Sequence, residues 1–281
     1  MSLQSSSTFN ARFRQTLITR KSLLCVGLDP EIEKLPAGLP HTAEGLVKFC
    51  LEIIAATAEF AAAFKVNFAF FEALGRPGWQ ALSDVAAALP ASTIKIADAK
   101  RGDIANSARL YAKAVFQELP FDALTVNPYL GEDAALPFLE EASKGVFFLC
   151  RTSNPGSAVM QHIPTQQSDG ATTPLYLHVA GLATCWNVHD NAGLVVGATH
   201  AAELTKIREH CPTLPFLIPG VGAQGGDLEM AVRAGATASG DLAIINASRA
   251  IIFADRGMNF AEAARRSAKK LKDDMQSLLA R

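Results

Sequence analysis

Two charged residues of opposite sign, Asp98 and Lys100, stand at the end of an apolar stretch of the sequence, with Asp103 close behind them. In an extended strand, residues two apart share a face, so Asp98 and Lys100 continue the row that Ile94 and Ile96 begin. This row is apolar at one end and charged at the other. A packed core does not need the charged end, so these residues are candidates for chemistry.

The order of these charges favours one of three kinds of chemistry. Carboxylates on either side of Lys100, with Lys65 expected from the neighbouring strand, favour the protonated amine. A lysine that forms a Schiff base needs a depressed pKa, and an ammonium group at the centre of a carboxylate site repels Mg²⁺. We therefore expect Lys100 to stabilise a developing anion and then to donate a proton to it. A purely structural charge network is the alternative.

A second group of residues has the composition of a phosphate site. The segments 219–226, PGVGAQGG, and 246–250, NASRA, follow the last two apolar stretches of the chain. Glycines let the backbone approach phosphate oxygens, and Arg249 can add a charged contact. We favour phosphate binding over the simpler interpretation, in which the glycines only turn the chain and Arg249 pairs with a surface carboxylate.

The elements that must hold these residues follow one rhythm, in which short apolar segments alternate with stretches of helical spacing. The expected strands are residues 23–29, 62–67, 93–100, 123–128, 146–153, 193–199, 216–222 and 243–250. Eight such units in 281 residues predict a single α/β domain over 1–281, a (β/α)₈ TIM barrel, ahead of a doubly wound sheet. No GxGxxG motif follows the first expected strand, which disfavours a dinucleotide-binding fold.

Nearly every expected strand ends in polar residues or glycine. In a barrel the chemistry lies at these carboxyl ends, so we expect residues far apart in the sequence to meet there. Any single one could be a solvated loop residue, and it is the joint pattern that indicates a site. The strand-end residues are Asp29, Lys65, Asn67, Asp98, Lys100, Asn127, Arg151, Ser153, Gly220, Gly222, Asn246, Ser248 and Arg249.

The amino-terminal segment 1–21 contains no acidic residue, which is the composition of a transit peptide. Phe9 and Phe13, however, have helical spacing, and Ser7 or Thr8 is suited to cap a helix that begins there. No small-residue cleavage signal separates the segment from the first strand. We favour a capping helix as an N-terminal extension of the barrel.

The overall composition excludes several classes of function. A formal net charge of −1 and a pI near 6.6 argue against nucleic-acid or membrane binding through bulk electrostatics. No apolar run approaches the ~20 residues of a membrane span. The five cysteines show no metal-ligand spacing, and their odd number favours buried thiols in a reducing compartment, so we expect a cytoplasmic protein. The polar segment 154–173 is expected to be a long loop insertion.

The segment DAKRGDI, residues 98–104, resembles the DxKxxDI signature of the orotidine 5′-phosphate decarboxylase family. Related sugar-phosphate enzymes share DxKxxD, but Ile104 and the segments PGVGAQGG and SRAI at matching intervals make the resemblance specific. It extends over almost the whole chain, from GLDP at 27–30 through FKVNFAFFE at 64–72 to RTSNPGS at 151–157. The loop insertion is similar to that of a longer bacterial-type branch of this family.

The resemblance implies a TIM barrel that converts orotidine 5′-monophosphate to uridine 5′-monophosphate in pyrimidine biosynthesis, with neither metal nor organic cofactor. It implies that Asp98 lies near the substrate carboxylate, that Lys100 protonates C6, and that Lys65 ties this array to the ribose. Asp103 would reach the active site of the other subunit in a homodimer, so that the two sites are shared across the interface.

The resemblance also implies residues that bind the rest of the substrate. Asp29 would contact the ribose, Ser153 the pyrimidine and Arg249 the phosphate. Gln224 would bridge base and phosphate, and Ser107 would reach the ribose of the partner chain. The complete substrate-binding set is Asp29, Ile104, Ser107, Ser153, Gly222, Gln224, Ser248 and Arg249.

Some residues receive no role from the sequence. By strand alternation Arg101 points away from the reaction centre, and Arg151 shares a face with Ser153 without an evident task. His162 and His178 are expected to be surface or packing residues. Three rival functions stay open: a Mg²⁺-dependent sugar-phosphate barrel, a Schiff-base aldolase, and a barrel that binds a nucleotide without catalysis.

Overall fold

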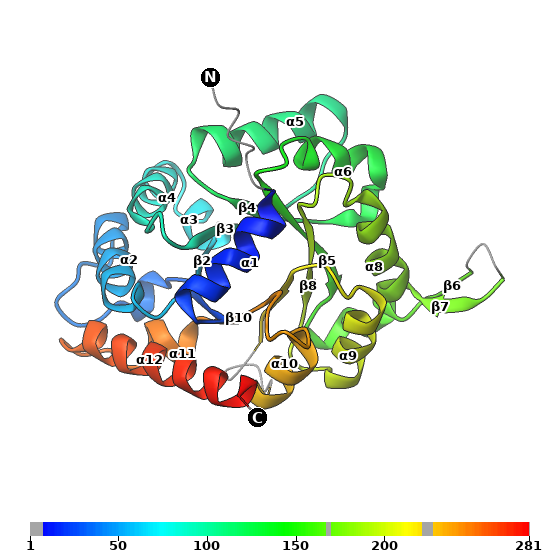
Figure 1. Ribbon diagram of the computed structural model, residues 1–281. Coiled ribbons are helices and arrows are strands. Elements are labelled where there is room, and N and C mark those ends of the chain that lie inside the picture. Colours follow the sequence, from blue (N-terminus) through cyan, green and yellow to red (C-terminus); the bar gives the residue numbers. More distant parts are fainter. Residues whose placement is uncertain (1–7, 167–169, 221–226, 281) are drawn as a thin grey trace, which may run out of the picture.

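The computed structural model describes residues 8–166, 170–220 and 227–280, and the main body of these residues is a closed barrel of parallel strands (Figure 1). The barrel strands are Leu24–Leu28 (β1), Ala63–Asn67 (β2), Ile94–Arg101 (β3), Ala123–Val126 (β4), Gly145–Arg151 (β5), Ala192–Val196 (β8), Phe216–Ile218 (β9) and Ala243–Ala247 (β10). Around the barrel they follow the order β1, β10, β9, β8, β5, β4, β3 and β2. The predicted (β/α)₈ barrel is confirmed, with a strand in each of the eight expected segments.

Helices alternate with the strands and cover the outside of the barrel (Figure 1). Their bounds are Phe9–Arg20 (α1), Ala43–Thr57 (α2), Ala69–Glu72 (α3), Arg76–Ala88 (α4), Ala105–Lys113 (α5), Glu132–Leu139 (α6), Leu175–Trp186 (α8), Ala201–His210 (α9), Leu228–Gly235 (α10), Arg249–Ile252 (α11) and Phe260–Leu279 (α12). Shorter helical turns are Ile32–Lys34 (η1), Ala114–Glu118 (η2) and Pro128–Leu130 (η3). Strands β1, β8 and β10 are buried along their whole length, because helices outside and side chains inside leave neither face to water.

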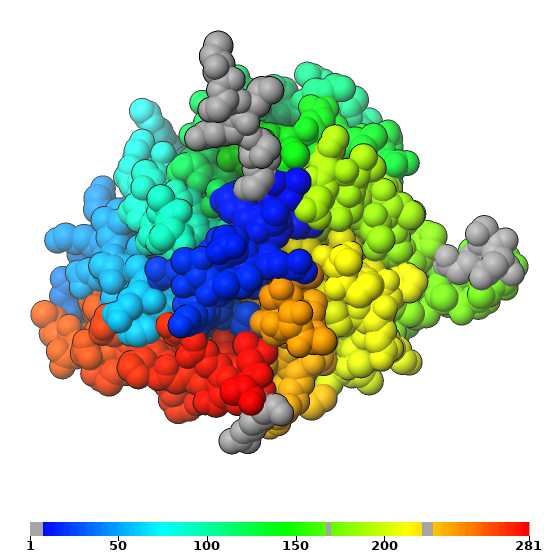
Figure 2. All heavy atoms as spheres, viewed as in Figure 1, coloured from blue at the N-terminus to red at the C-terminus, as the bar shows by residue number. Residues whose placement is uncertain are grey.

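Helix α1 lies across the amino-terminal end of the barrel, the end that faces the viewer in Figures 1 and 2. Thr8 is its N-cap, and the Thr8 side chain accepts a hydrogen bond from a backbone N–H of the first turn at 3.3 Å. Phe9 and Phe13 are buried, with ring centroids 6.0 and 6.1 Å from that of Phe147 on β5. The predicted capping helix is confirmed, although Ser7 lies outside the described residues. This helix closes the end of the barrel opposite to the carboxyl ends of the strands.

The segment 154–173 contains more secondary structure than the expected loop. It begins with the turn Pro155–Ser157 (η4) and the short helix Ala158–Gln161 (α7). An antiparallel hairpin of Pro164–Gln166 (β6) and Thr172–Pro174 (β7) then projects from the barrel (Figure 1). Strands of three residues are too short to show alternation in a sequence rich in Gly, Pro and Ser, so the sequence pattern did not predict them.

The cysteines and the helices bear on two further expectations. All five cysteines are free; Cys25, Cys50, Cys150 and Cys211 are buried, but Cys185 is exposed, so the expectation of buried thiols is wrong for that one. Cys185 lies near the end of α8, where one side of the helix faces solvent. Across residues 8–166, 170–220 and 227–280, no helix has both the length and the apolar character needed to cross a membrane.

Candidate active site

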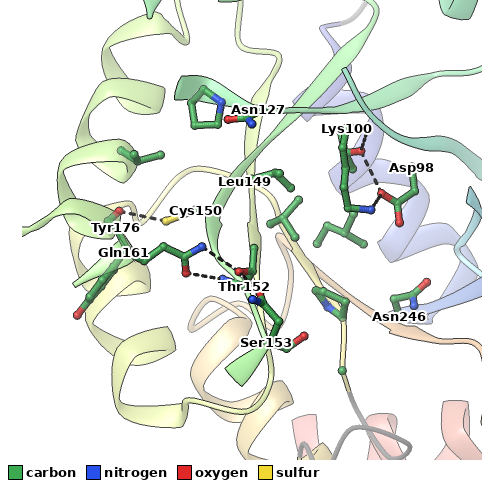
Figure 3. Close-up of a pocket in the computed structure, with 18 of the residues that line it drawn as sticks. Asp98, Lys100, Asn127, Leu149, Cys150, Thr152, Ser153, Gln161, Tyr176 and Asn246 are labelled. Atoms are coloured by element: carbon green, nitrogen blue, oxygen red, sulfur yellow. Dashed lines mark hydrogen bonds and ion pairs between the residues drawn. The ribbon is translucent and has the colours of Figure 1, made fainter. Parts of the chain in front are cut away.

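A cavity of about 880 Å³ opens at the carboxyl ends of the barrel strands (Figure 3). Almost all of the predicted strand-end residues line it: Asp29, Lys65, Asn67, Asp98, Lys100, Asn127, Ser153, Gly220, Asn246, Ser248 and Arg249. Gly222 and Gln224 lie outside the described residues. Among the described strand-end residues Arg151 is the exception, because its side chain is turned away from the cavity.

The charged residues of the cavity meet at one carboxylate. Lys65 Nζ lies 2.8 Å from Asp98 Oδ2, and Lys100 Nζ lies 2.6 Å from Asp98 Oδ1. The hydroxyl of Thr125 on β4 also donates to Asp98 Oδ1, at 3.1 Å. Both oxygens of Asp98 are therefore held by ammonium groups, and the carboxylate is fixed in one orientation.

The three charged side chains differ in their access to the cavity. The side chains of Lys65 and Asp98 are 5 % and 11 % exposed, whereas that of Lys100 is 51 % exposed. Lys65 is the most buried of the three, whereas Lys100 lies on the cavity with its ammonium group beside Asp98 (Figure 3). A ligand in the cavity would therefore meet Lys100 first.

Strand β3 does not follow regular alternation to its end. Lys100 has a φ of +45°, in the left-handed region that residues with a side chain rarely adopt, and the pairing of β3 with β4 shifts between Ala97 and Arg101. The backbone N–H of Lys100 bonds instead to the Thr125 hydroxyl at 2.9 Å. Such an irregularity changes the direction of a side chain, and strained backbone of this kind is concentrated at functional sites.

Burial and charge act in opposite directions on this array. Burial alone would raise the pKa of Asp98, but the ammonium groups of Lys65 and Lys100 outweigh it and hold the pKa well below its usual range. Burial disfavours the charged form of Lys65, but the carboxylates of Asp98 and Asp29 outweigh it, so the pKa of Lys65 is raised. Asp98 and Lys65 are thus both ionised at neutral pH.

Asp29, which follows β1, has an unusual acceptor. Its buried Oδ1 lies 3.7 Å from Lys65 Nζ and has no hydrogen-bond partner among the described residues. A buried carboxylate oxygen without a donor is costly to leave unsatisfied. Since Asp29 lines the cavity, this oxygen is available to a hydroxyl group of a ligand.

The last strand, which pairs with β1, and helix α11 form another part of the cavity wall. Asn246 Nδ2 donates to Ser248 Oγ at 3.2 Å, and Arg249 begins α11. Gly27 on β1 is required here, because a Cβ at this position would lie 1.9 Å from Ser248 Oγ. Ser248 and Arg249 thus lie together at the predicted phosphate end, on the same cavity as Lys100.

Three predicted residues lie away from the cavity of their own chain. Asp103, Ile104 and Ser107 are at the start of α5, and none of them lines the cavity. Ile104 is 57 % exposed, and the Asp103 carboxylate accepts the backbone N–H of Ile104 at 2.8 Å. Within one chain these side chains are therefore separate from the Lys65, Asp98 and Lys100 array.

Comparison with known proteins agrees with this arrangement of charged strand ends around one cavity. A sequence model of the Orotidine 5′-phosphate decarboxylase / HUMPS family matches residues 22–266. The chain belongs to this family. Orotidine 5′-phosphate decarboxylase of Roseiflexus sp. (strain RS-1) is 50 % identical to it over 273 residues, which are 97 % of this chain and 98 % of that protein.

Solved structures of this family are similar over nearly the whole chain. The structure of Leishmania donovani OMP decarboxylase has a TM-score of 0.85 and 40 % identity, and the match covers 98 % of this chain and 100 % of that one. The structure of Leishmania donovani UMP synthase has a TM-score of 0.86 and 41 % identity, and the match covers 97 % of this chain but 57 % of that longer chain.

Several cavity residues escaped the sequence reasoning. Thr125 lies inside a short apolar strand, and alternation from Asn127 could have placed it on the same face. An apolar wall from α8 was also missed, because helical spacing alone does not separate a core face from a cavity face. Its residues are Leu175, Tyr176, Val179 and Leu182.

The residues without a predicted role are now placed. Arg101 bonds to Glu72 and lies over the ring of Phe68 at 5.6 Å, outside the cavity, as alternation predicts. His178 lines the cavity, whereas His162 does not and contacts Glu203 instead.

The described residues do not suggest a metal site. In the part of the chain that the structure describes, no three His, Cys, Asp or Glu side chains come together where they could hold a metal ion. Both oxygens of Asp98 are already bonded to ammonium groups, which would repel a cation at this carboxylate.

Proposed function

We propose that this chain decarboxylates orotidine 5′-monophosphate (OMP) to uridine 5′-monophosphate (UMP), with Lys100 as the proton donor to C6. The observation that carries the assignment of Lys100 is the fixed Asp98 carboxylate with an ammonium group on each oxygen. Both lysines line the cavity, but the side chain of Lys65 is 5 % exposed and that of Lys100 is 51 % exposed. Membership of the family and the orotidine 5′-phosphate decarboxylase names of its relatives support the substrate.

The chemistry asks for a cation at the reacting carbon. As the bond from C6 to the carboxylate breaks, the electron pair stays on C6 and CO₂ leaves. Enzymes lower such barriers by about 8 to 23 kcal/mol, largely through charges already in place for the transition state. The ammonium of Lys100 meets the developing negative charge and transfers its proton to C6, and solvent then reprotonates the amine.

Other residues hold the substrate in register with Lys100. The unsatisfied oxygen of Asp29 is suited to a ribose hydroxyl, and Ser153 lies across the cavity from Lys100, where it can bond the pyrimidine (Figure 3). Ser248 and Arg249 are suited to the phosphate. Gly222 and Gln224 join this set on the resemblance of their segment to the family. Binding energy at the phosphate can then be used to position the base.

A homodimer completes the proposal. Asp103, Ile104 and Ser107 lie outside the cavity of their own chain. In a two-fold symmetric dimer, these residues of one chain would reach the cavity of the other chain. Exposed apolar residues occur on the same helix, α5, and on the turn η3 that follows the next strand, and exposed apolar surface is a feature of interfaces. These residues are Ile104, Leu110, Tyr111, Tyr129 and Leu130. Free, mostly buried cysteines support the expected cytoplasmic location.

The test is turnover of OMP by the purified protein, followed by the absorbance change on conversion to UMP. We expect equal rates with and without EDTA. Loss of the rate in EDTA would contradict a metal-independent reaction and favour the sugar-phosphate alternative. Borohydride treatment in the presence of substrate should leave the activity intact, because no Schiff base forms.

A further inference from the structure

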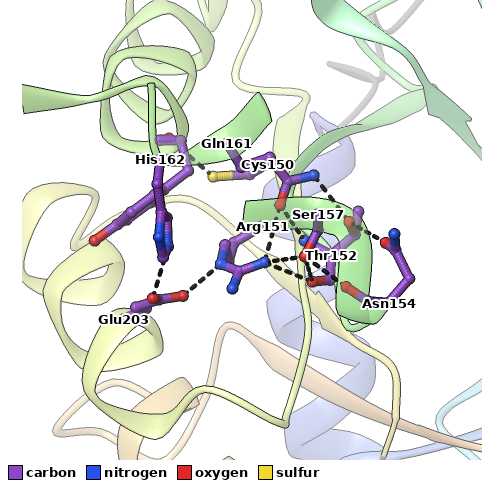
Figure 4. Close-up of polar contacts among 9 residues, drawn as sticks. Cys150, Arg151, Thr152, Asn154, Ser157, Gln161, His162 and Glu203 are labelled. Atoms are coloured by element: carbon purple, nitrogen blue, oxygen red, sulfur yellow. Dashed lines mark hydrogen bonds and ion pairs between the residues drawn. The ribbon is translucent and has the colours of Figure 1, made fainter. Parts of the chain in front are cut away.

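Arg151, at the carboxyl end of β5, is a buried arginine that the proposed reaction does not use. It is 2 % exposed and does not line the cavity, and its guanidinium lies between Glu203 on one side and Thr152 and Ser157 on the other (Figure 4). Burying a charge is unfavourable unless the charge is paired and hydrogen-bonded. The partners of Arg151 therefore indicate what this arginine holds.

These partners come from three parts of the chain. Nε of Arg151 donates to Glu203 of α9, and Nη1 donates to Gln161 of α7 at 3.1 Å. Nη1 also donates to the carbonyl oxygen of Thr152 at 2.9 Å and to the hydroxyl of Ser157. One guanidinium thus joins the end of β5, the 154–173 insertion and α9.

Gln161, a partner of Arg151, also forms two hydrogen bonds to Thr152. Its side-chain oxygen accepts the backbone N–H of Thr152 at 3.0 Å, and its Nε2 donates to Thr152 Oγ1 at 2.8 Å. The N–H and the C=O of Thr152 are therefore both held, by Gln161 and by Arg151. The residue that follows directly is Ser153, on the wall of the cavity opposite Asp98 and Lys100 (Figure 3).

Ser153 is also packed tightly from the side of β8. A Cβ on Gly197 would lie 2.9 Å from the backbone N of Ser153, so the two backbones are in close contact. Held at Thr152 and packed against Gly197, Ser153 has little freedom to move. A hydrogen-bonding group that is fixed in advance of binding loses less entropy when it meets its ligand.

We propose that Arg151 and Gln161 are positioning residues for the decarboxylation: together they fix the Thr152 peptide so that Ser153 is placed to bond the pyrimidine. This inference rests on the proposed function. Glu203 neutralises Arg151 and holds its other edge, and His162 Nε2 lies 2.9 Å from the second oxygen of Glu203. The insertion therefore contributes to substrate recognition through the backbone, by way of Gln161, as well as lining the cavity.

The test uses Gln161→Ala, which leaves the buried Arg151 and Glu203 pair intact and so avoids an unpaired charge. Misplacement of a bound group by about 1 Å can cost ~10²-fold in rate, so we expect kcat/KM for OMP to fall about 10- to 100-fold. Gln161→Glu keeps both acceptor contacts, to Arg151 and to the Thr152 N–H, and should retain most of the activity. Thr165→Val, which removes a hydrogen bond within the β6 and β7 hairpin, is the matched control and should behave as the wild type.

A double variant separates positioning from a structural role. If Gln161 acts through Ser153, then Gln161→Ala combined with Ser153→Ala should be no slower than Ser153→Ala alone. Effects that multiply in the double variant, or wild-type kinetics of Gln161→Ala or of Ser153→Ala, would overturn the inference while OMP turnover by the wild type stands. Absence of OMP turnover by the wild type would overturn the proposed function and this inference with it.

Discussion

At the scale of single residues, the site depends on a carboxylate that two lysines keep ionised. Asp98 is almost buried, and burial without Lys65 and Lys100 would favour its neutral form. Lys65 is equally dependent on Asp98, because Asp29 is farther from its ammonium group, at 3.7 Å. Each member of the array therefore stabilises the charge of another.

This interdependence predicts a loss of stability on neutralising Asp98. Asp98→Asn leaves the ammonium of Lys65 buried with one carboxylate fewer, and we expect the free energy of unfolding to fall by about 3 kcal/mol. Urea unfolding measures this difference. The control is Asp84→Asn on the exposed side of α4, where Asp84 accepts a hydrogen bond from Gln80, and its unfolding should be nearly unchanged.

The pH dependence of this loss follows from the direction of the pKa shifts. The pKa of Asp98 is lowered on folding, so its contribution to stability is present above the unfolded value of about 3.9 and is lost as the pH falls. The pKa of Lys65 is raised, so its contribution is present below about pH 10 and is lost as the pH rises further. The difference in unfolding free energy between wild type and Asp98→Asn should therefore be constant from about pH 5 to 9 and shrink below about pH 4. A difference that declines between pH 5 and 7 would contradict the lowered pKa.

At the scale of elements, strand β3 and its neighbour β4 bring the array together. The Thr125 hydroxyl on β4 receives the N–H of the strained residue Lys100 and donates to Asp98. With regular pairing between β3 and β4, the backbone N–H of Lys100 would not bond to the Thr125 hydroxyl. The irregular end of β3 is thus part of the site.

Thr125 offers a direct test of this arrangement. Thr125→Val has nearly the same shape but lacks the hydroxyl, so we expect a destabilisation of about 1 to 3 kcal/mol and a fall in kcat of about tenfold. Thr125→Ser keeps the hydroxyl and should stay near the wild-type kcat. Steady-state kinetics with OMP would decide it, and equal kcat values for the Val and Ser variants would count against the anchoring role.

The barrel was predictable because buried parallel strands appear in the sequence as continuous apolar runs. The site residues were predictable because they are the polar residues that follow these runs. The direction of Lys100 beyond the pairing shift and the hairpin in 154–173 were not predictable from periodicity. Arg151 was predicted to share a face with Ser153, but β5 ends at Arg151 and the two side chains differ in direction. Its partner Glu203 is 52 positions away, and such a pairing has no local sequence signal.

At the scale of the whole molecule, α1 covers the amino-terminal end of the barrel (Figure 1), whereas the residues that line the cavity stand at the carboxyl ends of the strands. Stability at one end can therefore be separated from chemistry at the other. Asp103, which precedes α5, does not line the cavity of its own chain. The proposed dimer would place Asp103 of each chain at the site of the other.

Mixing two inactive variants tests the shared site. After subunit exchange between equal amounts of Lys100→Ala and Asp103→Ala, half of the dimers are mixed and each has one intact site, so we expect about a quarter of the wild-type activity. The control mixes Lys100→Ala with Lys65→Ala, which lie in the same cavity, and should regain nothing. No recovery in the first mixture would mean that Asp103 does not act across the interface.

The most direct test of the central claim is kcat/KM for OMP of Lys100→Ala beside Lys269→Ala. Lys269 is an exposed lysine of α12 that pairs with Asp273, far from the cavity, and its loss should leave the rate unchanged. If Lys100 stabilises the developing charge and protonates C6, the Lys100→Ala rate should fall by more than about 10²-fold. A Lys100→Ala protein that is folded and within about tenfold of the wild type would contradict the assignment of this lysine.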